Sequence, residues 1–240
     1  MTDRPNKLPV PDLKLDILPP AQRHLWERMF SIPPSFILYG GTAIALQLGH
    51  RQSIDFDFFA FEEISPENLL HSVYILQDCE VLHSAPSTLT VLVDRAGPVK
   101  LSFFGLPKLR RLQPPLHSEE WPVRIATLLD LAGMKLATIP RRVEAKDYLD
   151  MHAILTRTDI SLEQGLAAAR IIYHDRINPL DTLKALTWFD DERLAQLPEE
   201  VREDLKKAVT DFDHDSMEYH QMLLEAALEV FLDDDDDVPF

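Results

Sequence analysis

The most constraining feature of this sequence is a pair of adjacent glycines, Gly40-Gly41, in a chain of 240 residues that contains only seven glycines. The pair lies between a short apolar run, residues 36–39, which predicts a strand, and residues 42–48, which predict a helix with Thr42 as its N-cap. Adjacent glycines allow backbone conformations closed to other residues, and the N-terminus of the following helix suits an anionic group such as a phosphate. The same pattern also fits a plain tight turn, so the glycines alone leave both interpretations open.

Two aspartates, Asp55 and Asp57, alternate with apolar residues in the next predicted strand, residues 54–59. Alternate side chains of a strand point to the same face, so these two carboxylates share a face with their Cα atoms about 7 Å apart. Like charges on one face repel each other, whereas such a pair of oxygen ligands suits Mg²⁺, with Mn²⁺ as a substitute. The alternative is a solvent-facing edge strand with two ordinary aspartates. The glycine pair 15 residues earlier favours the metal site.

The predicted elements change in kind near residue 106. Before it, we expect an α/β unit with further strands at 80–83, 88–94 and 99–104 and helices at 21–30 and 66–76. Beyond it, the apolar residues have helical spacing and predict helices at 127–139, 144–155, 162–173, 180–189 and 199–232. The predicted fold class is therefore α+β. It comprises a mixed sheet with flanking helices over residues 1–106, a helical half over 107–232, and an acidic disordered tail over 233–240.

Charge is distributed unevenly along the chain. The formal net charge is −16, and residues 201–240 hold 3 Lys and Arg against 13 acidic residues. Residues 95–146 instead hold 10 Lys and Arg against four acidic residues, and such a local basic stretch attracts phosphate whatever the total charge. No uninterrupted apolar run approaches 18 residues, which excludes a membrane span. A polar, proline-broken start and a single cysteine, Cys79, favour a cytoplasmic protein without a secretory signal or an internal disulfide.

Two motif blocks resemble a known family. Gly40-Gly41-Thr42 followed by residues 49–59 is similar to the GG(S/T)…DxD motif of the nucleotidyltransferase superfamily, in the form found in the AbiEii/AbiGii toxin family. Lys135 and the later stretch 142–150 (RVEAKDYLD) are similar to the K…RxxxKDxxDL motifs of that family. The resemblance spans residues 36–155. A second DxD, at residues 211–213, has no glycine turn before it and is interpreted as surface.

The resemblance implies a nucleotidyltransferase fold and transfer of a nucleoside monophosphate (NMP) from a nucleoside triphosphate (NTP) to an acceptor, with Mg²⁺ held by the aspartates. Characterised relatives act as toxins of bacterial toxin–antitoxin or phage-defence modules, and some modify the acceptor end of tRNA. RNA is therefore the expected acceptor, and an antitoxin protein is a candidate partner.

The same resemblance implies roles for individual residues. The phosphate-binding turn would be Gly40, Gly41 and Thr42, the metal ligands Asp55 and Asp57, and the neutraliser of phosphate charge Lys135. Lys146 and Asp147 would form a nucleotide-side pair, with Asp147 a candidate general base or acid. Further candidates for binding the nucleotide are Arg51, Ser53 and Arg142, although such residues are commonly just polar loop positions. The two blocks are expected to line one cleft.

One departure from the family pattern keeps other functions open. Many nucleotidyltransferases carry a third carboxylate on a later strand, but here the side chains expected on that face are Lys100, Ser102 and Phe104. Either Asp147 supplies the missing charge, or one metal binds, or the chain is a weak enzyme. The alternatives are a non-catalytic member that binds nucleotide or a partner protein, and a nucleotidyltransferase acting on a small hydroxylated molecule. The basic stretch favours RNA over the small molecule.

Overall fold

The computed structural model describes residues 11–235, which form two compact units. The first comprises the chain up to residue 107 together with residues 114–126, and the second comprises residues 108–113 and the chain from 127 onward. Residues 114–126, which the sequence assigned to the helical half, thus lie in the first unit. The last helix continues to Asp235, three residues into the segment expected to be a disordered tail, and residues 236–240 lie outside the described part.

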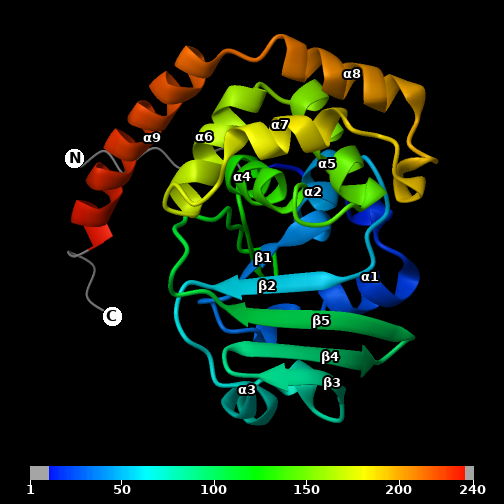
Figure 1. The fold of residues 1–240 in the computed structure, drawn as a ribbon. Coiled ribbons are helices and arrows are strands. Elements are labelled where there is room, and N and C mark those ends of the chain that lie inside the picture. The colour runs from blue at the N-terminus through cyan, green and yellow to red at the C-terminus, as the bar shows by residue number, and fades with distance from the viewer. Residues whose placement is uncertain (1–10, 236–240) are drawn as a thin grey trace. The chain divides into compact units, whose positions relative to one another are not determined.

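The first unit contains a six-stranded mixed sheet with the strand order β3-β4-β5-β2-β1-β6, of which β2, β5, β4 and β3 are seen one after another in Figure 1. Strand β2 runs parallel to β5 and antiparallel to β1, whereas β4 is antiparallel to both β3 and β5. The strands are β1 (Ile37–Tyr39), β2 (Phe56–Ala60), β3 (Glu80–Ala85), β4 (Thr88–Asp94), β5 (Pro98–Gly105) and β6 (Arg124–Ile125).

Strand β6 was not predicted, because its two residues lie in a proline-punctuated segment without a strand pattern of its own. It exists because Arg124 pairs with Ile37 of β1 in parallel, while Ile125 forms a bridge with Leu116. The sequence predicted only helices beyond residue 106, and this prediction is wrong for β6.

The two faces of β2 differ as the alternation of the sequence predicted. Phe56 and Phe58 are fully buried, and their rings stack on Trp26 and Phe103 respectively. Asp57 lies on the opposite, half-buried face. This hydrophobic core fixes the strand and thereby sets the face on which its carboxylate projects.

The α-helices described in the first unit are α1 (Pro20–Trp26), α2 (Gly40–Leu48) and α3 (Pro66–Ser72). Helix α2 begins two residues earlier than predicted, with Tyr39 at the N-cap and no side chain capping it. Thr42 is therefore not the N-cap. It lies inside the first turn, and its hydroxyl donates a hydrogen bond to the main-chain carbonyl of Asp55.

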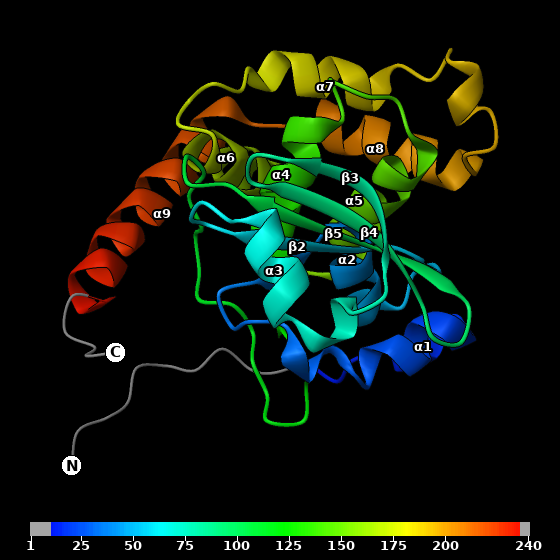
Figure 2. The ribbon, with the colours of Figure 1, turned by 90° about the horizontal axis from the view of Figure 1, so that it is seen from below.

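The second unit is a bundle of six described helices, α4 (Leu128–Thr138), α5 (Ala145–Arg157), α6 (Leu162–Ile172), α7 (Pro179–Thr187), α8 (Glu199–Thr210) and α9 (His214–Asp235). Figure 2 shows α7 and α8 side by side and α9 running away from them. The single helix predicted over residues 199–232 is thus two helices, and the break coincides with the second DxD, where the Asp213 carboxylate accepts a hydrogen bond from the amide of Asp215. Asp211 and Asp213 are exposed, as expected. No helix in the described range is long and apolar enough to cross a membrane.

Helices α4 and α6 approach closely because each has a glycine at the contact. A Cβ atom on Gly133 of α4 would lie 2.9 Å from the amide nitrogen of Ala169. A Cβ atom on Gly165 of α6 would lie 2.7 Å from Cδ1 of Leu136. This packing fixes α4, the helix that carries Lys135.

Candidate functional site

The glycine pair and the DxD segment meet within the first unit. Gly40 has φ +71°, a conformation that L side chains rarely adopt, and a Cβ atom on it would lie 2.7 Å from Oδ2 of Asp57. The carboxylate therefore occupies the space that any other residue at position 40 would use. The start of α2 and the carboxylate of β2 thus lie in direct contact, as a joint role for the two motif elements requires.

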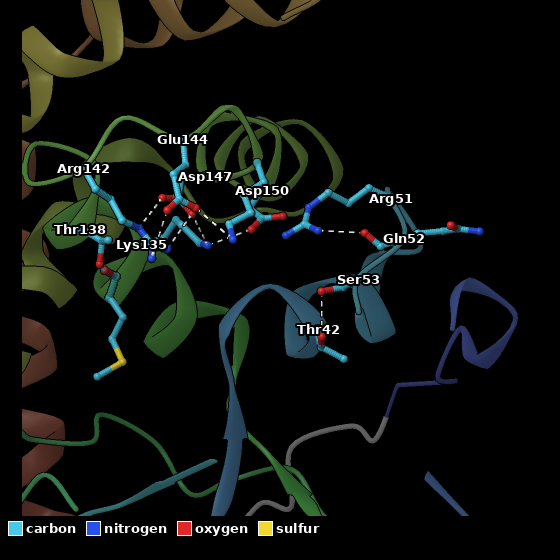
Figure 3. Close-up of polar contacts among 12 residues, drawn as sticks. Thr42, Arg51, Gln52, Ser53, Lys135, Thr138, Arg142, Glu144, Asp147 and Asp150 are labelled. Carbon is cyan, nitrogen blue, oxygen red and sulfur yellow. Dashed lines mark hydrogen bonds and ion pairs between the residues drawn. The ribbon is translucent and has the colours of Figure 1, made fainter. Parts of the chain in front are cut away.

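Two buried hydroxyl groups reinforce this arrangement. Thr42 Oγ1 lies 2.7 Å from Ser53 Oγ (Figure 3). It also donates a hydrogen bond to the main-chain carbonyl of Asp55. Both side chains are buried. In the structure these hydroxyls hold the loop before β2 against the first turn of α2. We therefore find the side chains of Thr42 and Ser53 positioning the aspartates rather than facing outward.

Strand β5 supplies the neighbours of the two aspartates. In the parallel pairing of β2 with β5, Asp57 is the register partner of Ser102, which in turn pairs with Thr90 of β4. Two residues before Ser102, and on the same face of β5, Lys100 Nζ lies 2.9 Å from Asp55 Oδ2. The position beside Asp57 where a third carboxylate would lie is therefore occupied by a buried serine, and the neighbouring position by a lysine.

The donor set of this cluster is compatible with a hard divalent cation. Asp55 directly precedes β2 and Asp57 lies on the half-buried face of that strand, and Mg²⁺ is usually held by one or two carboxylates with the remaining ligands from water and substrate phosphates. Among the side chains that the structure describes, there is no group of three or more His, Cys, Asp or Glu placed to hold a metal by themselves. These residues thus fit a cation completed by the phosphates of a ligand better than a closed, all-protein site.

The second motif block forms a buried ionic network within the second unit. Lys135 Nζ, on α4, lies 2.8 Å from Oδ1 of Asp147 and 2.8 Å from Oδ2 of Asp150, both on α5 (Figure 3). Arg142 donates from Nε to Oδ2 of Asp147, at 3.0 Å, and from Nη2 to Oδ1, at 3.2 Å. Both aspartates are 0% exposed and Lys135 is 8% exposed, whereas Arg142 is half exposed.

Lys146 and Asp150 take different places around this network. The Nζ atom of Lys146 lies 2.9 Å from Oε2 of Glu144, in an exposed ion pair, and the role expected for Lys146 and Asp147 at the nucleotide stays a prediction. Asp150 belongs to the second motif block, but the sequence predicted no role for it. Its spacing of three residues from Asp147 places both carboxylates on one side of α5. That spacing was the signal available in the sequence.

The network also affects the residue between the two aspartates. Burial, and to a smaller extent the Asp147 carboxylate, raises the pKa of the Tyr148 phenol to about 12, and its hydroxyl donates to the carbonyl of Ala185 on α7. Tyr148 therefore remains neutral and ties α5 to α7, which helps hold the ionic network in place.

Arg51 lies in the loop before β2, where its Nη1 donates to the main-chain carbonyl of Gln52 at 2.9 Å (Figure 3). In all, the structure brings together Gly40, Thr42, Ser53, Asp55 and Asp57 in one unit, and Lys135, Arg142 and Asp147 in the other. The expectation that both clusters line one cleft stays a prediction.

The fold is similar to that of a known nucleotidyltransferase. MenT4, a nucleotidyltransferase toxin of Mycobacterium tuberculosis, matches with a TM-score of 0.57 at 18% sequence identity, over 90% of this chain and 91% of that chain. At this identity the likeness shows the fold, and it confirms the predicted α+β class with a mixed sheet and a helical C-terminal half.

A family model carries the identification further. The model described as "Nucleotidyl transferase AbiEii toxin, Type IV TA system" matches residues 24–237, so the chain belongs to this family of toxin–antitoxin (TA) proteins. The resemblance inferred from the motifs is confirmed, and the enzyme class is nucleotidyltransferase. An uncharacterised protein of Aquifex aeolicus is also similar, with 32% identity over 189 residues that cover 77% of this chain and 87% of that protein.

Proposed function

We propose that this chain transfers a nucleoside monophosphate from an NTP to a hydroxyl group of an RNA acceptor of the tRNA type, with Mg²⁺ as the cofactor. The observation that carries the proposal is the contact between Gly40 and the Asp57 carboxylate. In this contact a helix N-terminus, which suits phosphate, lies directly beside one of the two carboxylates, a group that suits a divalent cation.

The first unit would bind the triphosphate. Helix α2 starts at Gly40 without a side-chain cap, so its first-turn N–H groups and positive dipole end suit phosphate oxygens. Asp55 and Asp57 would hold Mg²⁺, which when bound stabilises negative charge on the triphosphate and on the leaving pyrophosphate. Thr42 and Ser53 would keep the two carboxylates against the helix start, because their hydroxyls join these segments.

The second unit would contribute positive charge to the same reaction. Two buried carboxylates hold Lys135 in a fixed position, and Arg142 extends from the same network to a half-exposed position. Both oxygens of Asp147 already accept hydrogen bonds from cations, so these contacts favour a role in orienting Lys135 and Arg142 over proton transfer. Exposed Lys146, together with Arg51, would supply further contacts to the nucleotide.

Three features support RNA as the acceptor and an antitoxin as a partner. The stretch 95–146 is basic in an otherwise acidic chain, as binding of a phosphate backbone requires. Characterised proteins of the resembled family include enzymes that act on tRNA. The family's description places its members in toxin–antitoxin systems. A small hydroxylated acceptor is the alternative. A member that binds nucleotide or a partner protein without turnover is favoured by Ser102 at the position beside Asp57 and by the acidic stretch 201–240.

The decisive experiment is a transfer assay with each of the four NTPs labelled at the α-phosphate and total cellular RNA as acceptor. We expect Asp57→Asn to lower label transfer by about 100-fold or more, as is typical for loss of a group that stabilises transition-state charge. The matched control is Asp213→Asn, the same change in the exposed second DxD, which should transfer label like the wild type.

Each other outcome of these assays contradicts a particular part of the proposal. Equal labelling by the wild type and Asp57→Asn would overturn the metal-dependent mechanism. Labelling of added small alcohols in place of RNA would change the acceptor class. Tight NTP binding in isothermal titration without any labelled product would indicate the non-catalytic alternative.

A further inference from the structure

The side chain of Lys100 occupies an unexpected position for a metal-dependent site. Strand β5 runs parallel to β2 with Leu101 opposite Phe56, so the preceding residues, Lys100 and Asp55, also lie beside each other. Lys100 Nζ lies 2.9 Å from Asp55 Oδ2. An ammonium group therefore contacts one of the two carboxylates assigned to the cation.

The ion pair between Lys100 and Asp55 is placed so that a cation can replace the lysine. The Lys100 side chain is 41% exposed and that of Asp55 30% exposed, and ion pairs with this degree of exposure are weak because water competes for both partners. The buried pairs of Lys135, by contrast, have little access to water. A cation that takes Asp55 would thus displace Lys100 without disrupting the core, and Lys100 has a long, flexible stem with which to move.

We propose that Lys100 couples cation binding to nucleotide binding, by holding Asp55 in the free protein and moving to the triphosphate when the cation takes Asp55. The proposal rests on the proposed function and deepens it. It assigns Lys100 as a residue that binds the triphosphate and controls access to the metal site.

The coupling between cation and triphosphate binding has an electrostatic cause. A divalent cation at Asp55 and Asp57 leaves the displaced ammonium beside a second positive charge, which disfavours binding of the cation alone. A triphosphate brings about four negative charges, which satisfy both the cation and Lys100. Each ligand therefore raises the affinity of the protein for the other, and by linkage the factor is the same in both directions.

This coupling gives a physical reason for the absence of a third carboxylate on β5. With Ser102 beside Asp57 and Lys100 beside Asp55, this face of β2 and β5 carries less negative charge than a three-carboxylate site. Such a face would bind a free divalent cation weakly and a cation–triphosphate complex well. Lys100 and Ser102 both lower the affinity of this face for a free divalent cation.

The experiment measures Mn²⁺ binding by electron paramagnetic resonance, with and without a non-hydrolysable NTP analogue. The proteins are the wild type, Lys100→Met, which keeps the apolar stem, Lys100→Arg, which keeps the charge, and Lys184→Met as an exposed control in α7. For Lys100→Met we expect Mn²⁺ affinity without nucleotide to rise about 10-fold, and the enhancement of Mn²⁺ affinity by nucleotide to fall by a similar factor. Lys100→Arg and Lys184→Met should keep the wild-type enhancement.

The outcomes separate this proposal from the proposed function. If the wild type binds Mn²⁺ with the analogue, Asp57→Asn does not, and Lys100→Met keeps the full enhancement, the coupling by Lys100 is wrong while the metal site stands. If neither the wild type nor Asp57→Asn binds Mn²⁺ in the presence of the analogue, the metal site itself is wrong and both proposals fail. Loss of the enhancement in Lys184→Met as well would show a general charge effect and overturn the specific role.

Discussion

The Asp57 carboxylate fills the space where Gly40 would carry a Cβ atom, with Oδ2 only 2.7 Å from that point. We predict that Gly40→Ala lowers nucleotidyl transfer by about 100-fold or more, because the methyl group would displace the carboxylate that we propose as a ligand of the cation. Gly49→Ala is the matched control. It ends the same helix at φ +62°, so it carries a similar backbone strain of about 1 kcal/mol, but its Cβ meets only the flexible side chain of Lys14.

Urea unfolding and the transfer assay together test this prediction. Gly49→Ala should be slightly less stable and keep its transfer activity. If both variants lose activity to the same extent, strain in α2 rather than contact with Asp57 is the cause.

The ionic network of Lys135 predicts a large loss of stability on removal of the lysine. In Lys135→Met the buried carboxylates of Asp147 and Asp150 lose the ammonium that both contact, and breaking a buried pair in this way costs about 3 kcal/mol or more. Lys146→Met removes a neighbouring lysine that is 51% exposed, and it should change the free energy of unfolding by less than about 0.5 kcal/mol.

A double variant distinguishes lost charge pairing from lost packing. Adding Asp150→Asn to Lys135→Met should recover part of the stability, because one buried negative charge is removed together with its partner. Additive losses in urea unfolding would contradict a network and indicate independent packing defects.

The buried carboxyl group of Asp130, on α4, predicts a distinctive pH dependence of the free energy of unfolding. Burial raises the pKa of this carboxyl to about 6, although it accepts hydrogen bonds from the amide of Leu112 and the hydroxyl of Thr127. Between pH 4 and 6 the folded protein holds a proton that the unfolded chain has released. The contribution of Asp130 to stability is therefore fully present below about pH 4 and is lost as the pH rises through 6, by about 3 kcal/mol.

Asp130→Asn should remove this dependence while keeping an acceptor for the Leu112 amide. The stability of the wild type relative to Asp130→Asn should therefore fall from pH 4 to pH 6.5 in urea unfolding. Asp181→Asn, at an exposed position, should run parallel to the wild type. A difference that stays constant with pH for Asp130→Asn would show that the carboxyl is ionised throughout.

The close contact of α4 with α6 predicts unequal effects of two glycine substitutions. In Gly133→Ala the new methyl group meets the backbone of Ala169, which cannot move alone, so we expect a loss of about 1–3 kcal/mol. In Gly165→Ala it meets Cδ1 of Leu136, the end of a flexible side chain, and the better helix propensity of alanine offsets part of the cost. Thermal unfolding should rank Gly133→Ala as clearly the less stable of the two.

Local features of the fold could be predicted from the sequence because they depend on neighbours in the chain. The alternation of Phe56, Asp57 and Phe58 predicts the two faces of β2. Thr127 caps α4 and Ser65 caps α3 through side-chain hydrogen bonds to residues three positions on, which are contacts of the same local kind. Where a local pattern was overruled, a distant group was responsible. Thr42 fits an N-cap by sequence, but its hydroxyl bonds to the Asp55 carbonyl instead.

The sequence by itself determined the class of fold, the family and the kind of chemistry, because periodicity, paired glycines and motif spacing are written in consecutive residues. Tertiary structure alone decided which charges meet: Lys100 with Asp55, Ser102 beside Asp57, and Lys135 between Asp147 and Asp150. These contacts follow from the order and register of strands and from the packing of helices. Both are set by burial of apolar surface across the whole unit, so no short stretch of chain encodes them.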